Sequence, residues 1–156
     1  MSKTVSVEYG GRWFWAYDVS LGVLLLEAIH VAAEPGPSWV EDVVATLRIQ
    51  VELGANTVFL LDEKEWDGRQ RAYVRAIIAE AGRRFRRAGN ISAADAARRY
   101  VLDGEPFFLR GQEQIDGAVV ADLADAIERL ILDQLPPVPA PGRHWFFGVE
   151  DGPRTL

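Results

Sequence analysis

The sequence predicts a single α+β domain over residues 1–156, with about five helices packed on a small, mainly antiparallel sheet. Three observations support this fold class: an N-terminal β-hairpin signal, strands that do not alternate one-for-one with helices, and 49% hydrophobic residues in a 156-residue chain. A chain of this length buries roughly 70% of the surface that its unfolded form exposes, which suffices for one core. A doubly wound parallel sheet would require regular alternation of strands and helices.

The hairpin signal lies in the first 17 residues. Two alternating runs, Thr4–Tyr9 and Arg12–Tyr17, flank Gly10-Gly11, and glycine readily adopts the positive φ that a tight type I′ turn needs at both central positions. The register that follows places Val5, Val7, Phe14 and Ala16 on one face, and Thr4, Ser6, Glu8, Trp13, Trp15 and Tyr17 on the other. The aromatic half of that second face must be covered by the chain, a ligand or a partner.

Further elements follow from apolar periodicity and from capping residues. Asp18, Ser38, Ser92 and Asp116 are candidate helix N-caps. Helices are expected over about 19–33, 38–53, 69–88, 93–102 and from 117 past 131, and strands over 57–61, 106–110 and 144–147. Residues 136–141 contain four prolines and are expected to be extended. The aromatic segments 11–15 and 142–147 resemble each other, and one alternative is that they pair side by side.

The composition indicates which cellular compartment and which kind of partner to expect. There is no cysteine, no signal-peptide pattern and no apolar run of the ~20 residues that a membrane span needs. We therefore expect a cytoplasmic protein that does not enter the membrane. The net charge is −6, although residues 68–110 hold ten arginines against four acidic residues. An acidic chain favours basic partners.

Two groups of residues are candidate binding sites. The aromatic set Trp13, Trp15, Tyr17 and Trp145 has two interpretations: buried packing of the sheet, or a partly exposed platform of the kind that Trp and Tyr form in binding hot spots. An acidic-aromatic patch in the loop before the third helix is either a solvated loop or an anchor for a basic partner. Its members are Asp62, Glu63, Glu65, Trp66 and Asp67.

Other motifs are incomplete. Glu27, His30 and Glu34 share a helical face, but carboxylate-bridged metal bundles need a second Glu-x-x-His copy, so we expect no metal and no cofactor. An EF-hand beginning in the acidic loop fails because Val74 stands where a bidentate acid is required. Arginines 83, 84, 86 and 87 spread around their helix, which argues against nucleic-acid binding. No nucleophile, phosphate-loop or dinucleotide motif is present, so an enzyme is the less favoured expectation.

In size, acidity and lack of cysteine and of catalytic motifs, the chain resembles the profile of bacterial immunity and antitoxin proteins, which neutralise a toxin by covering it. The leading hypothesis is a non-enzymatic protein-binding domain that captures a basic partner through an acidic-aromatic surface. The alternative is a small-molecule-binding protein or minor enzyme whose pocket is lined by the four aromatic residues. Homodimerisation through the aromatic face is a third hypothesis.

Overall fold

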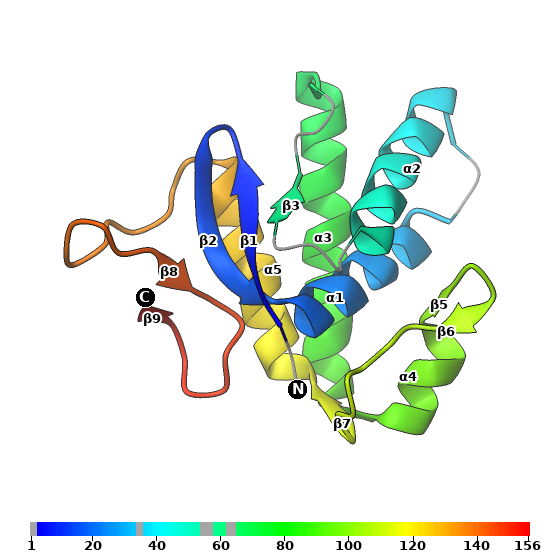
Figure 1. Ribbon diagram of the computed structural model, residues 1–156. Coiled ribbons are helices and arrows are strands. Elements are labelled where there is room, and N and C mark those ends of the chain that lie inside the picture. The colour runs from blue at the N-terminus through cyan, green and yellow to red at the C-terminus, as the bar shows by residue number, and fades with distance from the viewer. Residues whose placement is uncertain (1–2, 34–35, 54–57, 62–64) are drawn as a thin grey trace.

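The hairpin predicted at the N-terminus begins a mixed sheet that is covered on one face by helices (Figure 1). The computed structural model describes residues 3–33, 36–53, 58–61 and 65–156. In chain order its elements are β1 (Thr4–Tyr9), β2 (Arg12–Tyr17), α1 (Asp18–Val31), α2 (Ser38–Glu52), β3 (Val58–Leu60), α3 (Gly68–Ala88), β4 (Asn90–Ser92), α4 (Ala93–Arg99), β5 (Val101–Leu102), β6 (Glu105–Pro106), β7 (Gln114–Asp116), α5 (Gly117–Ile131), β8 (Trp145–Phe146) and β9 (Arg154–Thr155). Five helices with small, mostly antiparallel sheets confirm the predicted α+β class.

The hairpin register agrees with the prediction. Antiparallel β1 and β2 pair Val5 with Ala16 and Val7 with Phe14, and these four side chains are fully buried. Gly10 and Gly11 have φ of +59° and +78°, as a tight turn requires. Alternation along the strands therefore directs one hairpin face into the core and leaves the other face half-covered.

The five-stranded sheet has the order β3-β1-β2-β8-β9. In Figure 1, β8 and β9 lie beside β2, on the side of the hairpin away from β3. Strand β8 runs parallel to β2 with Trp15 opposite Phe146, which confirms that the two aromatic ends of the chain pair. At the far edge, the side-chain carbonyl of Gln50 accepts the Leu60 amide at 2.8 Å, so α2 satisfies an edge donor.

The core lies between the sheet and helices α1, α3 and α5. Helix α1 is buried almost all round, including a continuous buried run from Leu21 to Ala28. Helices α3 and α5 approach closely at Gly82, where an added Cβ would lie 2.7 Å from the Ala124 Cβ. Such contact between helices needs small residues, because a larger side chain would force the axes apart.

Several predicted boundaries were wrong. The strand expected over 106–110 is reduced to β6, which pairs antiparallel with β5 as a short hairpin, and α4 ends at Arg99 instead of 102 because that hairpin begins. Ser38 makes no capping hydrogen bond, since α2 is entered through Pro37. The Asp18 carboxylate accepts the amides of Lys3 and Val19 instead of capping α1 from outside.

Asp67, Ser92 and Asp116 do cap their helices through side-chain oxygens. Over the part of the chain that the structure describes, no helix combines the length and apolarity that a bilayer crossing would demand.

Candidate functional site

The outer face of the hairpin carries the aromatic side chains of β2. Trp13, Trp15 and Tyr17 are each half-buried, and the Trp13 and Trp15 rings meet edge-on with centroids 4.7 Å apart. The returning C-terminal segment supplies two further rings. His144 stacks on Trp13 at 3.6 Å, and Phe146 meets Tyr17 edge-on at 4.9 Å. The chain thus covers part of this face and leaves the rest exposed.

Trp145 lies apart from these three residues. Because side chains alternate along β8, the Trp145 ring points away from the face that carries Phe146. It stacks on Phe147 at 5.6 Å, and Phe147 in turn meets the core ring of Phe14. The indole Nε1 donates to the Pro136 carbonyl at 2.7 Å. The four aromatic residues proposed from sequence therefore do not surround one cavity, and His144 and Phe146 take the place expected for Trp145.

The described residues of the acidic-aromatic patch do not share one surface: Trp66 is buried, whereas Glu65 and Asp67 are exposed. Trp66 is only 6% exposed and stacks on Tyr9 at 6.1 Å, within the core, so the expectation that it anchors a partner was wrong. Asp67 forms a capping box with Gln70 at the start of α3, and Glu65 is exposed. Asp62 and Glu63 lie outside the described residues. Trp66 is buried because moving its large apolar ring from water into the core lowers the free energy more than exposure on a loop would.

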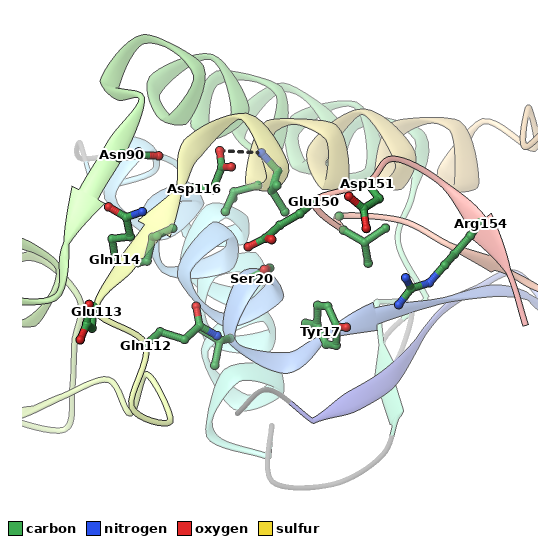
Figure 2. Close-up of a pocket in the computed structure, with 16 residues that line it drawn as sticks. Tyr17, Ser20, Asn90, Gln112, Glu113, Gln114, Asp116, Glu150, Asp151 and Arg154 are labelled. Atoms are coloured by element: carbon green, nitrogen blue, oxygen red, sulfur yellow. Dashed lines mark hydrogen bonds between the residues drawn. The ribbon is translucent and has the colours of Figure 1, made fainter.

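A cavity of about 690 Å³ lies beside Tyr17, and we call it the Tyr17 pocket (Figure 2). Figure 2 shows Gln112, Glu113 and Gln114 on one side of it, and Tyr17 and Arg154 on the other. Residues from α1, β7, α5 and the C-terminal tail meet there. Its polar lining residues are Tyr17, Ser20, Asn90, Gln112, Glu113, Gln114, Asp116, Glu150, Asp151 and Arg154.

The charged residues of the lining are mainly acidic. Glu113, Asp116, Glu150 and Asp151 are all exposed side chains, and they are opposed by a single cation in the lining, Arg154. Asp116 Oδ1 also accepts the first amides of α5, at 3.0 Å from Ala118 and 3.4 Å from Val119, so part of its charge is used by the helix terminus. The remaining carboxylates face solvent and are free to bind a cation.

Glycines in the C-terminal segment bring two of these acids to the pocket. Gly148 and Gly152 have φ of +70° and +82°, values that ordinary residues rarely adopt. The chain turns there, and Arg154–Thr155 returns to pair with β8. Arg154 also lies over the Phe146 ring at 5.2 Å. The sequence pattern of this segment predicts only a polar tail, although the acidic pair Glu150-Asp151, a few residues after the aromatic strand, was a visible signal.

A second polar cluster, between α1, α3 and α4, surrounds the buried carboxylate of Glu27. Glu27 is 3% exposed, and its two oxygens accept hydrogen bonds from Arg99 Nε at 2.7 Å and Arg99 Nη2 at 2.6 Å. Arg84 Nη1 donates at 3.2 Å and the Tyr100 hydroxyl at 3.0 Å. These four donors satisfy a carboxylate that would otherwise be costly to bury.

These contacts decide the protonation of the cluster. Burial by itself would raise the pKa of Glu27, but hydrogen bonds from Arg99 and Tyr100 and the charge of Arg99 outweigh it and hold that pKa below its ordinary value. Burial, aided by the neighbouring Glu27 charge, raises the pKa of the Tyr100 hydroxyl, which stays protonated and donating. The cluster is therefore ionised at neutral pH, with a charged carboxylate between two guanidinium groups.

The metal-ligand pattern noted in the sequence is not assembled as a site. Glu27 binds arginines, and His30 Nε2 lies 3.0 Å from the Arg99 carbonyl, while Glu34 is outside the described residues. Among residues 3–33, 36–53, 58–61 and 65–156, no three His, Asp or Glu side chains are grouped closely enough to hold a metal ion.

Two sites in the described structure thus bear on function: the Tyr17 pocket and the cluster of Glu27, Arg84, Arg99 and Tyr100, which we call the Glu27 cluster. Comparison of the chain with protein-family models, with curated proteins and with solved structures found no match.

Proposed function

We propose that this protein is a non-enzymatic protein-binding domain that captures a basic partner, and that the Tyr17 pocket is the centre of the interface. The observation that carries the proposal is the excess of exposed carboxylates over cations in the lining of a 690 Å³ cavity. A cavity of this size admits a long side chain, and an arginine or lysine is the one whose charge the lining complements.

The aromatic wall adds to this recognition. Tyr17 lines the pocket and also belongs to the half-exposed row that continues through Trp15 and Trp13. An arginine that enters beside Tyr17 gains contact with the ring face as well as charge pairing. Half-exposed Trp and Tyr side chains next to a charged pocket are typical of binding hot spots, in which a few rings contribute most of the affinity.

The charge also favours fast association. A net charge of −6 attracts a basic partner from a distance, and the aromatic contacts then slow its dissociation. This combination suits a protein that must neutralise a basic partner by covering it, which is why an immunity- or antitoxin-like role is our specific proposal.

The test uses a labelled arginine-rich peptide and two charge-neutralised variants. In the double variant Glu150→Gln/Asp151→Asn the peptide should bind about tenfold more weakly, because two carboxylates of the pocket are lost. The matched control is Glu41→Gln/Asp42→Asn, an adjacent and exposed acidic pair on α2, which should change affinity less than about twofold. Fluorescence anisotropy at about 50 mM and about 300 mM NaCl measures both the affinity and its expected decrease with salt.

Affinity purification from the native host, with wild type and both variants as bait, extends the test to the natural partner. A stoichiometric basic protein that is retained by wild type and by the α2 control, and lost by the pocket variant, would support the proposal. Equal loss in both variants would show that only overall charge matters, and absence of peptide binding would reject a basic partner at this pocket.

A further inference from the structure

A second cavity, independent of the Tyr17 pocket, lies over the Glu27 cluster. Its volume is about 300 Å³, and we call it the Arg99 pocket. Successive residues of β4 separate the two cavities: Asn90 lines the Tyr17 pocket and Ile91 lines the Arg99 pocket, because neighbouring side chains of a strand point to opposite faces. The lining of the Arg99 pocket combines two arginines with the apolar side chains of Phe85, Ala88 and Ile91.

The arginines retain donors that the buried carboxylate does not use. A guanidinium has five N–H groups. Arg99 gives two of them to Glu27, and Arg84 gives one to Glu27 and one to Glu80. Each therefore keeps three, and the side chains of Arg84 and Arg99 are 37% and 47% exposed. Glu27 thus holds two guanidinium groups in place while leaving their outer N–H groups accessible.

The surrounding charges leave the pocket receptive to an anion. Asp95 also lines it, but its carboxylate forms an ion pair with Arg98. Glu80 is shared among Arg83, Arg84 and Arg87. The lining itself holds two arginines, Arg84 and Arg99, and two acids, Glu27 and Asp95. When the described side chains paired with them are included, five arginines (Arg83, Arg84, Arg87, Arg98 and Arg99) stand against three acids (Glu27, Glu80 and Asp95).

The apolar wall indicates what else the ligand must carry. Phe85 is buried and stacks on Tyr100 at 5.9 Å, which makes that wall rigid. Ile91 is half-buried and Ala88 is exposed at the end of α3. An inorganic anion would contact the arginines and leave these side chains unused, whereas an organic anion with an apolar body would contact both.

We propose that the Arg99 pocket binds a small organic carboxylate, with its carboxylate on the outer N–H groups of Arg84 and Arg99 and its apolar body against Phe85, Ala88 and Ile91. A volume of about 300 Å³ is at the small end of ligand sites, so the body is about the size of one ring. The two guanidinium groups are pre-positioned by Glu27, which lowers the entropic cost of binding.

Benzoate is a suitable probe, and ¹H–¹⁵N NMR titration is a suitable measurement. We expect saturable shifts confined to the amides around residues 84–92 and 99–100, with a Kd on the order of 1 mM for a ligand of this size. Benzamide has the ring without the charge, and acetate has the charge without the ring. Both should bind at least about tenfold more weakly than benzoate if charge and apolar contact act together.

Two variants locate the site. Arg99→Gln should weaken benzoate binding about tenfold or more, but it also disturbs Glu27. Ala88→Leu leaves the Glu27 cluster intact and fills the cavity, so it should abolish the shifts. Its matched control is Ala72→Leu, at an exposed position of the same helix, which should bind benzoate as wild type does.

Each result of the titration either supports or overturns the proposed site. Loss of binding in Ala88→Leu with retention in Ala72→Leu supports the site. Absence of benzoate shifts, equal binding of benzamide, binding of inorganic phosphate as tight as that of benzoate, or unchanged binding in Ala88→Leu would each overturn the proposal. None of these results depends on the Tyr17 pocket, so the two proposals succeed or fail separately.

Discussion

Replacing Glu27 by glutamine tests how strongly the buried carboxylate stabilises the fold. Glutamine keeps the size of the side chain and one acceptor oxygen, but its amide nitrogen cannot accept hydrogen bonds. The contacts of Oε2 with Arg99 at 2.6 Å and with Arg84 at 3.2 Å are therefore lost. A hydrogen bond to a charged group contributes roughly 1.5–3 kcal/mol. Because both arginines remain partly hydrated, we reduce this to about 1 kcal/mol each.

The expected loss is thus about 2 kcal/mol in the free energy of unfolding, or roughly 4–8 °C in Tm for a chain of this length. Urea denaturation followed by circular dichroism measures it directly. The matched control is Glu128→Gln, which breaks the ion pair with Arg75 at 3.1 Å between side chains that are 40% and 32% exposed. That variant should lose no more than about 0.5 kcal/mol, since exposed ion pairs contribute little.

The difference between wild type and Glu27→Gln should depend on pH. The pKa of Glu27 is lower in the folded state than its ordinary value of 4.5, so the stabilisation is fully present above that value and is lost as the pH falls through the folded-state pKa. The difference in stability should therefore shrink as the pH falls below 4.5, and the two proteins should converge once the pH is below the folded-state pKa of Glu27. Equal losses for Glu27→Gln and Glu128→Gln, or a difference that does not change between pH 7 and pH 3, would refute the reasoning.

Three further substitutions test the packing by the same denaturation measurement. Gly117→Ala should cost about 3 kcal/mol or more, because the added Cβ would lie 2.1 Å from the Phe85 carbonyl oxygen, which is backbone and cannot move aside; a loss under about 1 kcal/mol would contradict this close approach. Phe14→Ala, at a fully buried position, should cost about 3–5 kcal/mol, and a neutral result would show that the inner hairpin face is not core. Trp145→Phe should cost about 1 kcal/mol through loss of the hydrogen bond to Pro136, and unchanged stability would exclude a role for that bond.

Several features of the fold were predictable because they depend on short stretches of chain. The Gly10-Gly11 turn and the alternation of its strands determine the register, so the burial of Val5, Val7, Phe14 and Ala16 followed directly. Caps at Ser92 and Asp116 were likewise recognisable, since a side-chain oxygen bonds amides only two or three residues away.

The short strands β4, β5, β7 and β9 were not predicted, and β6 was predicted with the wrong bounds. Each has two or three residues, which is too short for the alternation of apolar and polar residues to be recognised. Their positions depend on pairing partners elsewhere in the chain, such as β4 with β7. The expected strand over 106–110 failed for the same reason, because pairing with Val101–Leu102 ended the ladder at Pro106.

The candidate sites likewise combine features that depend on a short stretch of chain with features that depend on tertiary contacts. The sequence by itself determined that Trp13, Trp15 and Tyr17 share a face, since alternation along one strand is a local property. Only the tertiary structure decided that Trp66 is buried against Tyr9, and that Glu150 and Asp151 meet Glu113 around a common cavity. The pairing of Glu27 with Arg99 is also tertiary, because it joins residues 72 positions apart. Such contacts depend on how helices and strands pack, and no local periodicity encodes the free-energy balance that selects one packing.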